Sequence, residues 1–164
     1  MATRLQVLIP IIIAALIVGV AGVLSIPSDV KLESVEFPRG TVKIDDTVLE
    51  VQIADTEPRK TRGLMFQNAL PFDQGMIFVW DDMGQHGIWM LNMQFPLDIL
   101  WIDSNGQVTY IEKNVQPCKT AVETVTCPVY KNANSDAQYV LEVTSGFVDQ
   151  FNISTKSKLE IISI

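Results

Sequence analysis

The chain is 164 residues long, 48% of its residues are hydrophobic, and 19 acidic against 12 basic residues give it a net charge of −7 at pH 7. This length suits one domain with an appendage. Nucleic acid phosphates need a basic footprint on the protein, so the acidic balance argues against a nucleic acid partner.

The first predicted element is an apolar helix over residues 5–24, which contain one glutamine and no charged residue. At about 1.5 Å per residue, about 20 residues span the roughly 30 Å hydrocarbon core of a bilayer. A cleaved signal peptide is the alternative, but its apolar region is shorter, about 7–15 residues. We therefore expect residues 1–27 to be an uncleaved membrane anchor and tether. Arg4, the single charge before the apolar run, places the N-terminus in the cytoplasm and predicts a single-pass protein of the cell membrane.

Residues 28–164 are expected to form an extracytoplasmic domain, with eleven basic and nineteen acidic residues and a net charge of −8. Short runs of β-forming residues with period-two alternation are separated by turn residues here. The predicted strands cover residues 32–37, 41–44, 48–54, 75–80, 86–91, 97–103, 107–113, 138–144 and 158–164, and the predicted short helices cover residues 56–65 and 146–152. Many short strands favour a mostly β fold, a sandwich, jelly roll or barrel with one or two short helices.

Cys118 and Cys127 are the only cysteines, and they flank a short loop. In an oxidising compartment such a pair indicates a disulfide, and two cysteines alone underfill a tetrahedral zinc site. A metal site or a catalytic thiol remains the alternative. Asn152 begins an Asn-Ile-Ser sequon, which is a glycosylation acceptor only in an exported domain.

Six short blocks of residues follow one another with a characteristic order and spacing. They are Arg62-Gly63-Leu64-Met65, Gly75-Met76-Ile77-Phe78, Trp89-Met90 with Asn92, Pro96-Leu97-Asp98-Ile99, Pro117-Cys118, and Tyr139-Val140-Leu141-Glu142 with Gly146. The series resembles domain of unknown function family 192 over residues 42–164. The resemblance implies a compact, mostly β and often exported domain, and it implies no activity. The family usually has lysine and threonine where this chain has Leu91 and Met93, so a role that depends on that lysine does not transfer.

Polar residues within or beside apolar runs are the candidate ligand-binding residues. They are Arg62, Asn92, Asp98 and Glu142, with Trp89 as an apolar wall. A buried polar or ionised group costs stability unless it finds a partner, so we expect these residues to converge on a pocket for a small polar ligand. The alternative is a closed Arg62–Asp98 ion pair that fixes the short helix to the sheet.

Copper handling at the cell envelope is a second candidate function. Met83, His86, Met90 and Met93 supply thioether and imidazole groups, which suit Cu(I). A straight strand points Met90 and Met93 to opposite faces, so these ligands converge only if the strand bends.

A hydrolase of unknown specificity that uses Asp98 and Glu142 is a third candidate. No catalytic triad surrounds the single histidine, and no phosphate-binding or dinucleotide-binding motif is present. We expect a domain that binds a small polar ligand or an envelope partner protein, without a cofactor and without an assigned catalytic residue. Four apolar residues of the predicted strands are expected in the core: Trp89, Met90, Ile99 and Trp101.

Overall fold

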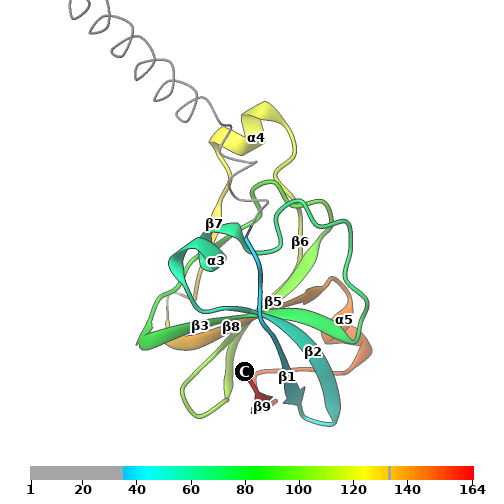
Figure 1. The fold of residues 1–164 in the computed structure, drawn as a ribbon, viewed down its shortest axis with the longest axis vertical. Helices are drawn as coiled ribbons and strands as arrows, with labels where there is room; N and C mark the ends of the chain where they lie inside the picture. Colours follow the sequence, from blue (N-terminus) through cyan, green and yellow to red (C-terminus); the bar gives the residue numbers. More distant parts are fainter. Residues whose placement is uncertain (1–34, 133) are drawn as a thin grey trace, which may run out of the picture. The chain divides into compact units, whose positions relative to one another are not determined.

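The computed structural model describes residues 35–132 and 134–164, and in these residues the chain forms nine strands and three short helices (Figure 1). In chain order they are β1 (Arg39–Ile44), β2 (Thr47–Ala54), α3 (Glu57–Arg62), β3 (Gln74–Gly84), β4 (Ile88–Trp89), β5 (Leu97–Ile102), β6 (Val108–Val115), α4 (Ala121–Val125), β7 (Val129–Tyr130), β8 (Ala137–Thr144), α5 (Phe147–Gln150) and β9 (Leu159–Ser163). The predicted mostly β domain is confirmed. Residues 5–24, where we expect the anchor, lie outside the described residues, and no helix among the described residues is long and apolar enough to cross a bilayer.

The hairpin of β1 and β2 shows how the sequence pattern forms the sheet. Val42 and Ile44 are buried, while Thr41 and Lys43, which alternate with them, are only partly covered. The turn between β1 and β2 begins at Asp45, whose φ of 50° lies in the left-handed region that aspartate tolerates. Alternation along the strand therefore turns one face of the hairpin toward the core.

Seven strands form one mixed sheet in the order β6-β5-β8-β3-β2-β1-β9. β2 and β3 are parallel, and α3 lies in the crossover that a parallel pair requires. All other neighbours in this sheet are antiparallel. A single bridge between Gln107 and Lys158 connects the two edges, so the sheet curls toward itself but is not a closed barrel.

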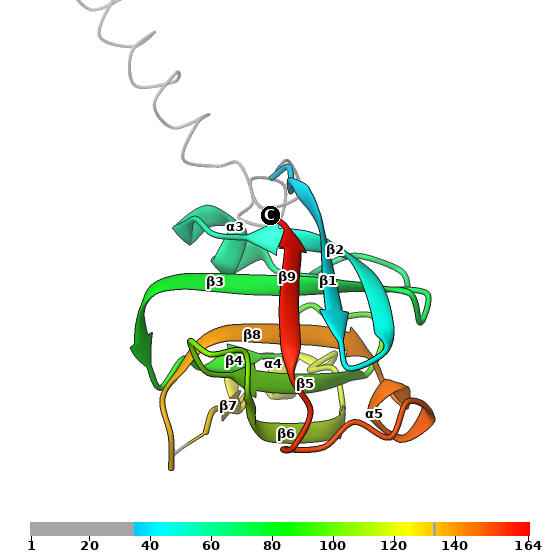
Figure 2. The ribbon, with the colours of Figure 1, turned by 90° about the horizontal axis from the view of Figure 1, so that it is seen from below.

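Both faces of the central strands are covered, because successive side chains point to opposite sides. Ile77 and Leu141 pack in one hydrophobic cluster with residues of β1, β2, β9 and α5. Met76 and Val140 pack in a second cluster, together with residues between positions 88 and 95. Figures 1 and 2 show β1, β2 and β9 on one side of the central strands, with α3, α4, β4 and β7 on the other.

The cysteines form the predicted disulfide. The Cys118 and Cys127 sulfur atoms are 2.15 Å apart and the Cα atoms 5.9 Å apart. The loop between them contains α4, whose start is fixed by a capping box of Thr120 and Glu123. Directly after this loop, β7 pairs with β4, so the disulfide holds the partner strand of Trp89 in place.

Two predicted strands are wrong in the described residues. Residues 35–37 form no strand, and within 86–91 only Ile88 and Trp89 do, in a separate two-stranded sheet. The chain turns directly afterwards, where Met93 N–H donates to the Met90 carbonyl. β4 therefore ends at Trp89, two residues before the end of the strand predicted over residues 86–91.

Candidate functional site

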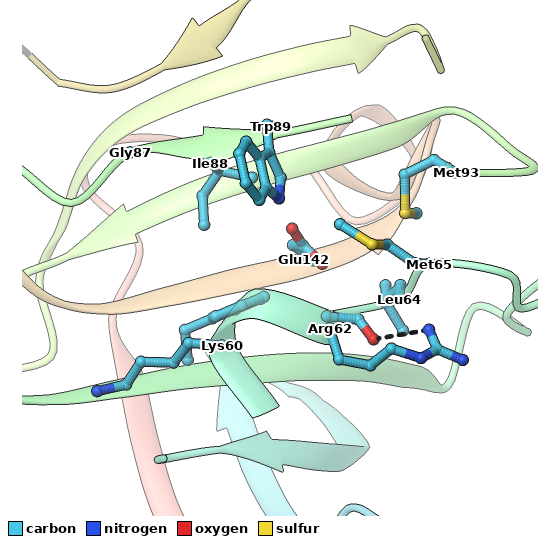
Figure 3. A pocket seen from close by; sticks show the side chains of 11 residues that line it. Lys60, Arg62, Leu64, Met65, Gly87, Ile88, Trp89, Met93 and Glu142 are labelled. Carbon is cyan, nitrogen blue, oxygen red and sulfur yellow. Dashed lines mark hydrogen bonds between the residues drawn. The ribbon is translucent and has the colours of Figure 1, made fainter. Parts of the chain in front are cut away.

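Glu142 is a carboxylic acid in the middle of the sheet. It lies on β8 between Met76 of β3 and Ile99 of β5, and it is buried. Its Oε2 atom has no hydrogen-bond partner among the described residues. Figure 3 shows the side chain pointing from the sheet toward Trp89. The fold thus leaves one oxygen of this buried carboxyl without a hydrogen-bond partner among the described residues, on a side chain that points toward Trp89.

Burial raises the pKa of Glu142 from its ordinary value of 4.5 to about 8, because desolvation disfavours the charged form. The carboxyl is therefore mostly protonated at neutral pH. In that state it both donates and accepts a hydrogen bond.

A small cavity, which we call the recess, lies between Glu142 and Trp89 (Figure 3). Its volume is about 30 Å³, room for one or two groups the size of a water molecule. Its apolar lining comes from four segments of the chain, with Leu64, Met65, Phe78, Ile88, Trp89 and Met93. A carboxyl at the base of apolar walls is suited to orienting one small polar group.

A larger and more open cavity, the groove, adjoins the recess and has a volume of about 420 Å³. The two share Phe78, Ile88 and Trp89 as lining residues. Trp80 and His86 form one wall of the groove, with parallel rings whose centroids are 3.9 Å apart. The groove is therefore an aromatic surface that leads to the recess.

Trp89 is 43% exposed, so the prediction that it lies in the core is wrong. Its neighbours Ile88 and Met90 are buried, as are Ile99 and Trp101, which were also predicted in the core. β4 is a short strand at the surface. Successive side chains of a strand point to opposite sides, so Ile88 is buried and Trp89 lies over the recess.

Arg62 also borders the recess, but its charged end lies elsewhere. The residue is buried, and its guanidinium donates to the Gly63 carbonyl at 3.5 Å and lies over the Phe66 ring, 5.1 Å from its centroid. In Figure 3 the guanidinium points away from Glu142. Arg62 thus contributes its aliphatic stem and backbone to the recess.

Asp98 lies on the opposite face of the sheet from Glu142, and the expected convergence of the two is wrong. In the β5–β8 register Asp98 pairs with Val143, whereas Glu142 pairs with Ile99. The Asp98 oxygens accept three backbone N–H groups, from Asn114 at 2.9 Å and from Gly146 and Val148 at 3.0 Å. This carboxylate therefore anchors the start of α5.

The expected third polar group, Asn92, is a turn residue with a φ of 55°. Its carbonyl accepts the Phe66 N–H at 3.1 Å, and its side chain is not among those that line the recess. Of the predicted binding residues, the structure brings together Arg62, Trp89 and Glu142. The sequon residue Asn152 is exposed, and its glycosylation stays a prediction.

The four predicted copper ligands lie in different surroundings. Met83 is exposed, His86 stacks on Trp80, Met90 is fully buried and Met93 lines the recess. Across residues 35–132 and 134–164, no group of three or more His, Cys, Asp or Glu side chains is placed to hold a metal ion. The chain does turn after Met90, but Met90 stays fully buried, whereas Met83 is exposed.

Lys60, Met65 and Trp80 are among the lining residues that sequence reasoning missed. Lys60 places its Nζ 5.2 Å from the centroid of the Trp80 ring. Trp80 follows Phe78 by two positions and stacks near it, at 5.9 Å between centroids. Phe78 and Trp80 are two positions apart on β3, and this spacing is the sequence signal that their side chains lie on the same face of the sheet.

Residues 40–161 match the family model of DUF192, which is described as an uncharacterised ACR. The chain belongs to the DUF192 family. The resemblance of residues 42–164 to this family is thereby confirmed. No protein with a curated description is significantly similar in sequence to this DUF192 chain.

Two solved structures resemble the DUF192 chain in fold. A candidate transcription regulator from Sinorhizobium meliloti 1021 superposes with a TM-score of 0.68 at 27% identity, over 78% of this chain and 97% of that chain. A protein of unknown function from Novosphingobium aromaticivorans DSM 12444 superposes with a TM-score of 0.67 at 23% identity, over 79% of this chain and 95% of that chain. The latter similarity concerns the fold alone.

Proposed function

We propose that this DUF192 domain is a binding domain anchored at the outer face of the cell membrane, and that the recess and groove together take one small organic ligand. The open position on the buried Glu142 carboxyl carries the proposal. A buried hydrogen-bonding group without a partner costs about 1–3 kcal/mol. Natural proteins retain such unfavourable local features mainly at functional sites.

The form of the cavity supports a ligand with two parts. The recess has space for one small polar end group, and the groove has space for the larger remainder. Small-molecule sites combine mainly apolar walls with a few placed polar groups, in cavities of about 300–1,000 Å³. Exposed Trp89 at the junction of the two cavities offers its ring to both parts of such a ligand.

The location rests on the sequence. Residues 5–24 are long and apolar enough to span a bilayer, and the disulfide fits an oxidising compartment. We therefore propose a single-pass membrane protein with residues 28–164 outside the cytoplasm. Carbonate extraction of membranes and N-terminal sequencing test this: release of the chain, or a mature N-terminus near Ile26, contradicts the anchor.

The other candidate functions have less support. A hydrolase with two cooperating carboxyls needs Asp98 and Glu142 on one side of the sheet, and β5 and β8 place them on opposite sides. Cu(I) binding by the four predicted ligands needs Met90 at the surface, but Met90 is core. The S. meliloti protein is described as a candidate transcription regulator, but a role of this chain that involves contact with DNA disagrees with its net charge of −7.

Ligand binding can be tested with the indole N–H signals of the three tryptophans in the ¹⁵N-labelled full chain. We expect some members of a library of small aromatic compounds, with neutral, cationic and anionic end groups, to shift the signals of Trp80 and Trp89. Trp89→Ala should abolish the shift at Trp80, whereas Val48→Ala, which removes an exposed apolar side chain outside both cavities, should not. A library without any such compound contradicts the proposal, and binding that survives Trp89→Ala places the site elsewhere.

A further inference from the structure

We infer that the recess recognises the ammonium end of a primary amine, whose organic part lies in the groove along Trp80 and Trp89. This inference rests on the proposed ligand-binding function and names the class of ligand.

The composition of the recess favours a cation. Among the described residues, the buried side-chain oxygen without a hydrogen-bond partner is Oε2 of Glu142, which lines the recess, and the Trp89 indole lies opposite. A cation near a carboxylate and a tryptophan face gains both an ion pair and a cation–π contact. The groove already holds such a contact, since Lys60 Nζ lies 5.2 Å from the centroid of the Trp80 ring.

The charged groups around Glu142 leave the recess available to a cation. From α3, Lys60 and Arg62 border it, but Figure 3 shows both charged ends pointing away. The Lys60 ammonium is 3.7 Å from Glu57, and the Arg62 guanidinium lies over Phe66. The neighbours of Glu142 on β3 and β5 are the uncharged Met76 and Ile99.

An anionic end group finds no comparable partner. The nearest basic side chains, Lys60 and Arg62, are engaged elsewhere and would have to turn round. The domain as a whole carries a net charge of −8 over residues 28–164, which attracts cations and repels anions.

The volume of the recess restricts the type of cation. About 30 Å³ accommodates an –NH3⁺ group and the beginning of its alkyl stem. Three methyl groups on the nitrogen need more space than the three hydrogens of a primary ammonium. A quaternary ammonium of the same skeleton is therefore expected to bind more weakly than the primary ammonium.

Binding of the cation requires Glu142 to ionise, so a proton leaves as the amine enters. The protonated amine R–NH3⁺ meets Glu142–COOH, the carboxyl proton goes to solvent, and R–NH3⁺ pairs with the carboxylate. Burial holds the pKa of Glu142 at about 8, so the observed affinity should rise about 100-fold from pH 6 to pH 9 and level off above pH 8. Below pH 8 close to one proton should be released per ligand.

The experiment compares three probes that share one ring and differ in the end group: 2-phenylethylamine, 2-phenylethanol and 3-phenylpropionate. The full 164-residue chain in neutral lipid nanodiscs is titrated at pH 6, 7, 8 and 9, with empty nanodiscs as blank. We expect the amine alone to shift the Trp80 and Trp89 signals strongly, with the stated pH dependence. The trimethylated amine should bind at least tenfold more weakly than the primary amine.

Calorimetry in two buffers of different ionisation enthalpy measures the released proton on the unaltered chain and needs no variant. Glu142→Gln should remove the pH dependence and weaken amine binding at pH 9 at least tenfold, while exposed Glu160→Gln should change neither. If the alcohol or the carboxylate binds more tightly at Trp89, or if amine affinity is constant with pH, the amine class is wrong and the binding function stands. If no probe in the wider library reaches Trp89, both proposals fail together.

Discussion

The buried Glu142 carboxyl makes a sharp prediction about stability. In the folded chain burial holds the pKa of Glu142 at about 8, whereas in the unfolded chain the carboxyl titrates near 4.5. Between these values the folded state binds more protons than the unfolded state, so stability falls as pH rises through this window. Glutamine has the same shape as glutamate and does not ionise, so the unfolding free energy of Glu142→Gln should not show this decrease with pH.

The size of the effect follows from the two pKa values. The interval from 4.5 to about 8, at about 1.4 kcal/mol per pH unit, corresponds to roughly 5 kcal/mol of folding free energy. Of this, roughly 4 kcal/mol falls between pH 5 and pH 9, because the first half unit is already lost at pH 5. The Gln side chain carries its own cost for an unpaired amide, but that cost is the same at every pH.

Urea unfolding of the full chain, followed by near-ultraviolet circular dichroism at pH 5, 7 and 9, measures this difference. The unfolding free energy of Glu142→Gln minus that of the unaltered chain should become more positive by about 4 kcal/mol from pH 5 to pH 9. Glu160→Gln is the matched control, because its exposed side chain stays in water and should show a constant difference. Parallel pH profiles for Glu142→Gln and the unaltered chain refute the assignment of a buried, protonated carboxyl, whatever the absolute stability of the variant.

Three further predictions concern residues away from the recess. Asp98→Asn should destabilise the domain by about 2 kcal/mol or more, because three backbone N–H groups lose a charged acceptor, and it should leave amine binding to the remaining folded protein unchanged. Met90→Ala should cost about 2–5 kcal/mol in urea unfolding because Met90 is fully buried, whereas exposed Met83→Ala should cost less than about 1 kcal/mol. Replacing Cys118 and Cys127 by alanine together should cost roughly 2–3 kcal/mol, the loop-closure contribution of a crosslink at a separation of 9 residues, and thiol mapping of the unaltered chain should find no free cysteine.

Local sequence signals predicted the parts of the fold that depend on neighbouring residues. The short helix predicted over residues 56–65 is present as the shorter α3, and Gly63 ends it with a φ of 47°. The short separation of the cysteines predicted their bond. The α4 helix was missed, although Thr120 and Glu123 have the spacing of a capping box and are a readable signal of its start.

The location of the site depends on pairing between distant strands, which no local pattern contains. Asp98 and Glu142 both look like carboxyls inside an apolar strand. The register of β5 against β8, which pairs Asp98 with Val143, places one of them under α5 and the other under Trp89. A register shifted by one residue would have put both on one side, and only the packed sheet distinguishes the two arrangements.

The departures of this chain from the usual family pattern acquire a meaning once the recess is located. Threonine is usual in the family at the position of Met93, and Met93 lines the recess in this chain. Met93 therefore contributes a thioether to the cavity lining where a threonine would contribute a hydroxyl, and in Figure 3 Glu142 directs its carboxyl toward Trp89. Leu91, where lysine is usual, is half-buried and forms a bridge to Cys118. Met93 makes the lining of the recess less polar than a threonine would, and a less polar lining strengthens the desolvation that holds the proton on Glu142. Because this desolvation keeps the carboxyl protonated at neutral pH, the proposed amine ligand must displace that proton when it binds.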